Sequence, residues 1–204
     1  KNLQDGDLVI TKFGICLFLQ AAPATFGSCI VTSPNLIKQD FEDIMSQKFE
    51  KVAVLGAGVM GAQIAGHFTN AGIPALLFDI NQELAQKGVD GLTKLKPAPL
   101  YKPKNAELVT ACNYDDHVER LSEVDLVIEA VAERIDIKHA VYNNIVPHLK
   151  DSVILTSNTS GIPLGDLTTV LPDSLKKRFM ITHFFNPPRY MRLLELVKGP
   201  ETDE

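Results

Sequence analysis

The chain has 204 residues, of which 45% are hydrophobic and 22% are charged, and its formal net charge is −5 at pH 7. This length supports one hydrophobic core with a small appendage, and the composition is that of a soluble globular protein. The acidic balance, without a run of lysine or arginine, argues against a nucleic-acid surface. No apolar run is long enough to span a bilayer, since even residues 13–31 contain Gln20, Pro23 and Gly27.

The three cysteines, Cys16, Cys29 and Cys112, are widely spaced and form no C-x-x-C pattern. Their odd number and spacing favour a reducing compartment over a disulfide framework or a zinc site, so we expect no metal. We predict that each cysteine is a small buried hydrophobic residue, in a cytoplasmic protein or, for a eukaryotic source, a mitochondrial matrix protein. Asp5 and Asp7 lie where a secretory signal would carry positive charge, which argues against such a signal.

The first 44 residues differ from the rest of the chain. They contain Pro23 and Pro34 and show no clear helical periodicity. A nucleotide-binding unit commonly opens a few residues before its first strand, so we predict a domain over 45–204 that starts at Met45. Residues 1–44 are then a leader, an upstream extension or a linker of uncertain structure.

Residues 51–79 predict a strand, a glycine turn, a helix and a second strand that ends in an acid. The turn has the pattern G-x-G-x-x-G between a strand over 52–55 and a helix over 59–70, which is the context of a dinucleotide site. Gly56 permits the tight turn, Gly58 lets the backbone approach a pyrophosphate, and Gly61 lets the helix pack on the sheet.

Two features of this unit predict how the dinucleotide binds. The amides at the start of the helix, at Val59 and Met60, face the phosphates. Asp79 follows the strand over 75–78, about 20 residues beyond the glycines, where a ribose-binding acid is expected. Its carboxylate accepts hydrogen bonds from a ribose 2′-hydroxyl and repels a 2′-phosphate, so we predict NAD rather than NADP. The alternative is that Asp79 is a solvated acid at a strand end.

Strands and helices continue to alternate along the rest of the chain. The pattern predicts a helix over 82–96 that the proline-rich passage 97–103 ends, a strand over 109–113, a helical turn over 116–122, a strand over 125–130, a helix over 137–149 that Pro147 bends or restarts, and strands over 153–156, 179–184 and 193–197. Alternation of this kind predicts an α/β fold with a doubly wound, mostly parallel Rossmann sheet. Ligands bind at the carboxyl ends of such strands, where polar clusters fall at 129–138, 157–160 and 183–186.

His183 is the candidate general base. It follows a predicted strand, and Glu195 lies on the next one after the turn at residues 186–188. If the two strands are neighbours, the carboxylate reaches an imidazole nitrogen and fixes its tautomer. A base beside a hydride acceptor favours alcohol oxidation. The alternative is a satisfied core histidine, because Phe184 and Phe185 follow it.

Four motifs together resemble a known family. They are GAGVMG at 56–61, EAVAER at 129–134, SNTSGIPL at 157–164 and HFFNPPRYMRLLELV at 183–197. In this order they are similar to the NAD-binding domain of the L-3-hydroxyacyl-CoA dehydrogenase family of fatty-acid β-oxidation, over residues 51–204. PLYKPKN and HFFNPPRY are more similar to the long bacterial type, in which an enoyl-CoA hydratase domain is fused to the dehydrogenase.

The resemblance implies catalytic roles at four positions. His183 would be the base and Glu195 its partner, Ser160 would bond the substrate oxygen near the nicotinamide, and Asn186 would help to hold substrate and cofactor. The residues alone leave other interpretations open. Ser160 is also a suitable helix cap, and Asn186 before Pro187 is also an ordinary turn residue.

The resemblance further implies that Glu133 and Lys138 line the cofactor and substrate cleft. The alternative is a solvated pair at a helix start. Lys87, Lys94 and Lys96 are candidates for the phosphates of CoA, although surface lysines are usually only solvated.

The implied activity is NAD-dependent oxidation of 3-hydroxyacyl-CoA to 3-oxoacyl-CoA. In the family, a helical domain follows this one, closes the substrate cleft and commonly forms the contact of a homodimer. The 204 residues do not include it, so we expect turnover by these residues alone to be impaired. One alternative is an NAD-binding module without turnover. Another is a β-hydroxyacid dehydrogenase, which would use a lysine base and lacks the HFFNP motif.

Overall fold

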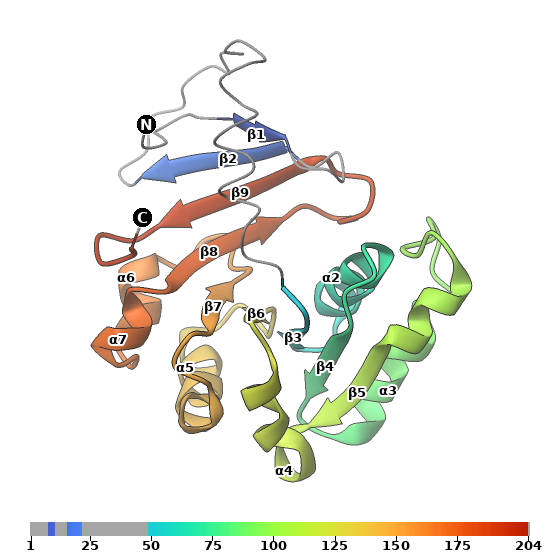
Figure 1. Ribbon diagram of the computed structural model, residues 1–204, viewed down its shortest axis with the longest axis horizontal. Helices are drawn as coiled ribbons and strands as arrows, with labels where there is room; N and C mark the ends of the chain where they lie inside the picture. The colour runs from blue at the N-terminus through green and yellow to red at the C-terminus, as the bar shows by residue number, and fades with distance from the viewer. Residues whose placement is uncertain (1–7, 11–15, 22–48, 204) are drawn as a thin grey trace.

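The protein forms one nine-stranded sheet in the computed structural model, which describes residues 8–10, 16–21 and 49–203 (Figure 1). The strand order across the sheet is β1-β2-β9-β8-β7-β6-β3-β4-β5. The strands are β1 (Leu8–Ile10), β2 (Cys16–Ala21), β3 (Val52–Leu55), β4 (Ala75–Asp79), β5 (Val109–Asn113), β6 (Leu126–Glu129), β7 (Ile154–Ser157), β8 (Phe179–Phe184) and β9 (Leu193–Lys198).

Six of these strands form a parallel block that sets the position of the site. From β5 through β4, β3, β6 and β7 to β8, every neighbouring pair is parallel. The chain builds outward from β3 in one direction and then from β6 in the other, so the strand order reverses between β3 and β6. Such a reversal opens a crevice at the carboxyl ends of the two strands. The predicted doubly wound, mostly parallel Rossmann sheet is confirmed.

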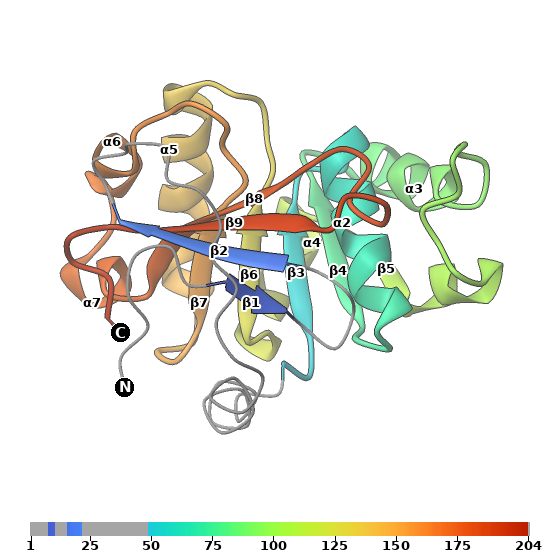
Figure 2. The same ribbon diagram turned by 90° about the horizontal axis from the view of Figure 1, so that it is seen from above.

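Helices cover both faces of the sheet (Figure 2). The helical segments are α2 (Val59–Asn70), α3 (Gln82–Gly91), η1 (Pro103–Leu108), α4 (Tyr114–His117), η2 (Val118–Glu123), α5 (Ile135–Ile145), η3 (Val146–His148), α6 (Leu164–Thr168) and α7 (Asp173–Lys176). Side chains alternate across β3 as a strand requires. Val52 and Val54 pack into the cluster on the α2 side, whereas Ala53 and Leu55 pack into the cluster on the α5 side.

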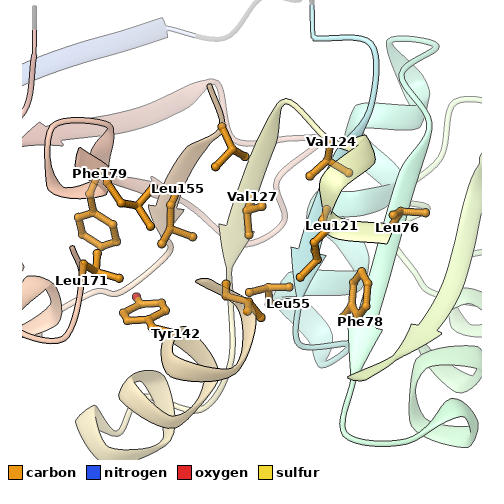
Figure 3. Packing of buried hydrophobic residues seen from close by; sticks show 14 of the residues in the cluster. Leu55, Leu76, Phe78, Leu121, Val124, Val127, Tyr142, Leu155, Leu171 and Phe179 are labelled. Carbon is orange, nitrogen blue, oxygen red and sulfur yellow. The ribbon is translucent and has the colours of Figure 1, made fainter. Parts of the chain in front are cut away.

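The core on the α5 side joins segments that are distant in the sequence (Figure 3). Tyr142 of α5 and Phe179 of β8 pack edge to face with ring centroids 6.0 Å apart, and both are 0% exposed. Leu121 and Val124, near the end of η2, are also fully buried in this cluster. The cluster therefore fixes α5 and η2 against the sheet that carries the site.

The predicted helix over 82–96 is too long, because α3 ends at Gly91. The amides of Lys94 and Leu95 bond to the Gly91 carbonyl in a tight turn. This turn carries Leu92 into the core, where it is 1% exposed. The apolar spacing that suggested a longer helix thus reflects burial of Leu92 after the helix has ended. The short helices α6 and α7 were not predicted, since four or five residues are too few to show a helical period.

Two strands from the first 44 residues extend the sheet. β2 pairs parallel to β9, and β1 pairs antiparallel to β2. Cys112 in β5 is a free, fully buried thiol, as predicted. Cys16 lies in β2, and Cys29 lies outside the described residues. Over the described residues, the helices are all too short or too polar to cross a membrane.

Phe179→Ala is expected to lower the free energy of unfolding by about 3–5 kcal/mol, because it leaves a cavity beside Tyr142 in a fully buried cluster. Urea unfolding measures this change. Leu108→Ala is the control, because Leu108 is 38% exposed and its loss costs far less. Equal losses for the two variants would contradict the packing.

Candidate active site

The glycine turn after β3 is shaped by close backbone contacts. Gly56 has a φ of +102°, and a Cβ there would lie 2.6 Å from the carbonyl oxygen of Ala130, which follows β6. A Cβ at Gly61 would lie 1.8 Å from the carbonyl oxygen of Gly56. The first position needs the left-handed region that favours glycine, and the second needs the absence of a side chain. Both glycines hold α2 tightly against the end of the sheet.

Gly58 differs from these two glycines, because no described atom lies within 4 Å of a Cβ placed there. It is the N-cap of α2, and no described side chain caps the helix or places an acid in its first turn. The space beside Gly58 is therefore open at the positive end of a 12-residue helix, whose first amides include those of Val59 and Met60. This cradle fits the pyrophosphate of a dinucleotide.

Asp79 ends β4 beside this turn, at the position that the sequence predicts. One carboxylate oxygen accepts the Ala57 amide at 2.7 Å, and the other accepts the Ile80 amide at 2.7 Å. A carboxylate accepts about four hydrogen bonds, so capacity remains for ribose hydroxyls. Asp79 is therefore anchored to the glycine turn and is not only a solvated acid at a strand end.

His183 and Glu195 face each other on β8 and β9, which are antiparallel neighbours with these two residues in register. His183 Nδ1 lies 2.8 Å from Glu195 Oε2. A carboxylate only accepts hydrogen bonds, so Nδ1 carries the proton and Nε2 of the neutral ring is an acceptor. The Phe185 ring packs against the imidazole, with centroids 4.7 Å apart. The expected pairing is thus present, and the strand register produces it.

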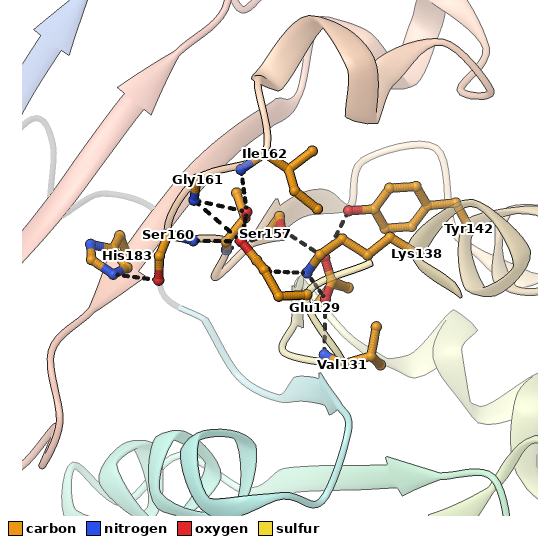
Figure 4. A network of polar contacts seen from close by, with 11 residues as sticks. Glu129, Val131, Lys138, Tyr142, Ser157, Ser160, Gly161, Ile162 and His183 are labelled. Atoms are coloured by element: carbon orange, nitrogen blue, oxygen red, sulfur yellow. Dashed lines mark hydrogen bonds and ion pairs between the residues drawn. The ribbon is translucent and has the colours of Figure 1, made fainter. Parts of the chain in front are cut away.

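Ser160 lies on the loop after β7 and points to His183 (Figure 4). Its Oγ is 3.2 Å from His183 Nε2. The same loop is joined to β8 by Asn158, whose Oδ1 accepts the Phe184 amide at 2.8 Å. The hydroxyl and the imidazole nitrogen therefore converge on one point at the carboxyl end of the sheet, where a reacting hydroxyl can contact both.

Asn186 follows β8 and is exposed. Its Oδ1 lies 3.5 Å from the Nε2 of Gln63, a buried residue of α2. This contact links the loop after β8 to the helix behind the glycine turn. Sequence analysis did not identify Gln63, and a single polar residue in a buried helical segment gives no signal for such a role.

Glu133 and Lys138 form an ion pair with Nζ and Oε2 3.2 Å apart, but they differ in exposure. The Lys138 side chain is 1% exposed, between Glu129 and Glu133, whereas the Glu133 side chain is 45% exposed. The alternative of a solvated pair is therefore wrong for Lys138. Glu129, which is 0% exposed, was not selected as a site residue, although its place at the end of a buried strand was a usable signal.

Lys87, Lys94 and Lys96, the candidates for the phosphates of CoA, are exposed on α3 and the turn after it, and their role stays a prediction.

The pKa of Glu133 is lowered. Partial burial raises it, but hydrogen bonds from Thr159 and Lys138 and the charge of Lys138 outweigh burial and hold the pKa below the ordinary value of a glutamate. Two further donors, the amides of Ser160 and Gly161, lie 3.0 and 3.2 Å from the same carboxylate. The loop that carries Ser160 thus rests on an ionised Glu133.

With this geometry, residues 51–204 match the protein family described as "3-hydroxyacyl-CoA dehydrogenase, NAD binding domain". The chain belongs to this family. The match begins one residue before β3 and includes the glycine turn, Asp79, Ser160 and the His183–Glu195 pair. The expectation of an NAD-binding domain is confirmed, and the cradle at α2 fits that cofactor.

Two named relatives and one solved structure support this family membership. A protein of Rickettsia felis named "Putative fatty acid oxidation complex trifunctional enzyme" is 43% identical over 160 residues, which are 75% of this chain and 22% of that protein. A "Probable 3-hydroxyacyl-CoA dehydrogenase" of Deinococcus radiodurans is 40% identical over 163 residues, 76% of this chain and 47% of that protein. The (S)-3-hydroxybutyryl-CoA dehydrogenase structure from Ralstonia eutropha has a TM-score of 0.65 at 32% identity and covers 77% of this chain and 56% of its own. The chain thus matches less than half the length of the two named relatives.

Gly58→Val is expected to weaken NAD binding about tenfold or more, because a side chain at this position enters the space where the phosphates approach the helix amides. Its melting temperature is expected to change little, since no described atom is displaced. Calorimetric titration with NAD measures the affinity. Gly91→Ala, at another position without a described neighbour within 4 Å, is the control, and equal affinities for both variants would argue against the cradle.

Glu133→Gln is expected to change how stability depends on pH. Because the pKa of Glu133 is lowered in the fold, its contribution to stability is fully present above the ordinary glutamate pKa of about 4.3. The contribution is lost as the pH falls through the lower pKa of the folded state. Urea unfolding at a series of pH values is expected to show the unaltered chain more stable than the variant at pH 7, with the difference vanishing in acid. A difference independent of pH would contradict this.

Proposed function

We propose that this domain supplies the cofactor site and the general base for oxidation of 3-hydroxyacyl-CoA to 3-oxoacyl-CoA. One observation carries the proposal. His183 Nε2, the acceptor nitrogen of an imidazole held by Glu195, lies 3.2 Å from Ser160 Oγ at the end of the sheet that also bears the glycine turn. The names of the relatives support the same reaction.

His183, Ser160 and Glu195 have separate roles in alcohol oxidation. The substrate hydroxyl donates to His183 Nε2 and contacts Ser160 Oγ, which orients the oxygen. As the hydroxyl proton moves to Nε2, the imidazole becomes cationic, and the Glu195 carboxylate at 2.8 Å stabilises that charge. NAD, when bound, supplies the acceptor for the hydride that leaves the carbon bearing this hydroxyl. In the reverse direction the protonated His183 returns its proton to the oxo group.

Cofactor choice follows from Asp79. Both of its oxygens accept backbone amides at 2.7 Å, which holds the carboxylate beside the glycine turn. A fixed negative charge there repels a 2′-phosphate. This supports NAD over NADP.

The relatives bear on the wider assembly. The name of the Rickettsia felis protein describes a trifunctional enzyme of a fatty acid oxidation complex, which supports placing this domain in the long, fused type. The homodimer through a helical domain stays a prediction.

Replacing His183 with Gln is expected to lower turnover by about 10²- to 10⁴-fold, because the variant has no group to exchange a proton with the substrate oxygen in either direction. NAD affinity is expected to stay nearly unchanged, since His183 lies on β8 and the glycine turn follows β3. Mixing the purified chain with acetoacetyl-CoA and NADH and following absorbance at the cofactor band measures turnover.

His139→Gln is the matched control, because His139 lies on α5 and bonds to the Asp166 carbonyl. Turnover equal to that of the control would remove His183 from the reaction. NAD binding without any turnover by the unaltered chain would instead favour an NAD-binding module.

A further inference from the structure

Asn186 lies on the loop between β8 and β9, and this loop runs beside α2 (Figure 2). Its described hydrogen-bond partner is Gln63, whose Nε2 lies 3.5 Å from Asn186 Oδ1. That distance is longer than the roughly 2.7–3.2 Å of an ordinary hydrogen bond from nitrogen to oxygen, so the contact is weak. Asn186 is also exposed, so packing does not hold its side chain. Stronger contacts elsewhere on the loop must therefore set its position.

Arg189 makes these stronger contacts, to the proline-rich passage. Its Nη1 donates to the Ala98 carbonyl at 2.6 Å and to the Leu100 carbonyl at 2.7 Å. The guanidinium carbon lies 4.7 Å from the ring centroid of Tyr101 and 5.1 Å from that of Tyr190. Hydrogen bonds from a charged donor are about twice as strong as neutral ones, and a cation over an aromatic ring is attracted further. Arg189 is therefore the main anchor of the loop.

The proline-rich passage is itself held on α2. At the end of that helix, the Asn70 side chain donates to the Pro99 carbonyl at 2.8 Å and accepts the Tyr101 amide at 2.7 Å. Leu100 is 5% exposed and packs so closely on Gly66 that a Cβ there would lie 3.1 Å from the leucine side chain. The passage is thus fixed to the α2 surface, and the guanidinium binds to a fixed partner.

The segment from Asn186 to Arg189 has little conformational freedom. The amides of Tyr190 and Met191 both donate to the Pro187 carbonyl, at 2.9 and 3.0 Å, which closes a compact turn. Both residues between the asparagine and the arginine are prolines, whose rings fix φ. An anchor at one end of this segment therefore also restricts the other end.

We propose that Arg189 is a positioning residue: it binds the loop after β8 to the proline-rich passage on α2 and thereby holds Asn186 in one position at the carboxyl end of the sheet. Arg189 acts on the reaction through Asn186. This effect on turnover rests on the proposed function, whereas the attachment of the loop does not.

The test compares Arg189→Met with Arg178→Met. Both changes remove a guanidinium that bonds to a backbone carbonyl, because Arg178 Nε donates to the Val153 carbonyl at 3.1 Å. Arg178 precedes β8, at the opposite end of the strand from the loop. A purely structural role would therefore give the two variants the same behaviour. Circular dichroism and thermal melts establish that each variant is folded at the assay temperature.

If Arg189→Met does not fold, Arg189→Lys replaces it in every measurement. Lysine keeps the cation but lacks the planar group that lies between the two tyrosine rings, so the attachment is still weakened.

Backbone ¹⁵N relaxation at Asn186, Tyr190 and Met191 measures the attachment of the loop. We expect order parameters of about 0.85 in the unaltered chain and in Arg178→Met, and values below about 0.6 in Arg189→Met. A folded Arg189→Met chain in which these order parameters stay near 0.85 overturns the proposal.

A double-mutant cycle with Asn186→Ala measures the effect on turnover of acetoacetyl-CoA and NADH. Arg189→Met is expected to lower kcat/KM on the order of tenfold when Asn186 is present, because a misplaced contact group costs orientation. In the Asn186→Ala chain the same change is expected to alter kcat/KM by less than about twofold, since the group that Arg189 positions is already absent.

Two outcomes of the cycle overturn the effect on turnover. One is an equal loss from Arg189→Met in both backgrounds, because Arg189 would then not act through Asn186. The other is an Asn186→Ala chain as active as the unaltered one. Absence of turnover in the unaltered chain overturns the proposed function instead, and the relaxation result still decides whether Arg189 attaches the loop.

Discussion

The close contact between the Gly56 turn and the end of β6 is the constraint on which the site depends. The Gly56 amide bonds to Phe78 at 2.8 Å, and the Ala130 amide bonds to Leu55 at 2.8 Å, so the turn is held between β4 and β6. A side chain at Gly56 would meet the Ala130 carbonyl. This contact brings the start of α2, the acid at the end of β4 and the loop after β6 to one edge of the sheet. The remaining parts of the site lie at the same edge.

Two kinds of electrostatic arrangement operate side by side at this edge. At the start of α2, backbone amides provide positive potential and the first turn holds no acidic side chain, so an anion can bind with little rearrangement. Beneath the loop after β7, a buried carboxylate and a buried ammonium are paired at 2.7 Å, with further donors that satisfy the carboxylate. The first arrangement is open to a ligand. The second is buried, and its charges are paired with each other.

The pairing of β8 with β9 positions the candidate base at this edge of the sheet. β9 is antiparallel to β8, whereas the six strands from β5 to β8 are parallel. The reversal sets Glu195 directly opposite His183, so the carboxylate orients the imidazole through the strand register and needs no flexible loop. Rigid placement matters because a base contributes to catalysis only when it lies within hydrogen-bond reach of its proton.

Much of the fold and of the cofactor site could be predicted from the sequence, because the residues that form them lie close together along the chain. The glycines, the helix over 59–70 and Asp79 follow each other within one unit, and each answers a steric demand that residue type alone expresses. Alternation of apolar strands with helices fixed the fold class in the same way. The end of α3 was predicted wrongly, because the burial of Leu92 after Gly91 mimics one more helical turn.

The contacts that connect distant segments were decided only by the tertiary structure. The sequence places a lysine on the helix after β6 and glutamates at residues 129 and 133, but not the burial that turns them into one connected network. Likewise, the contact between Gln63 and Asn186 spans 123 residues and leaves no local pattern. Residue identity determined which groups can bind, donate or accept. Burial and strand register determined which of them meet, because both depend on the packing of the whole chain.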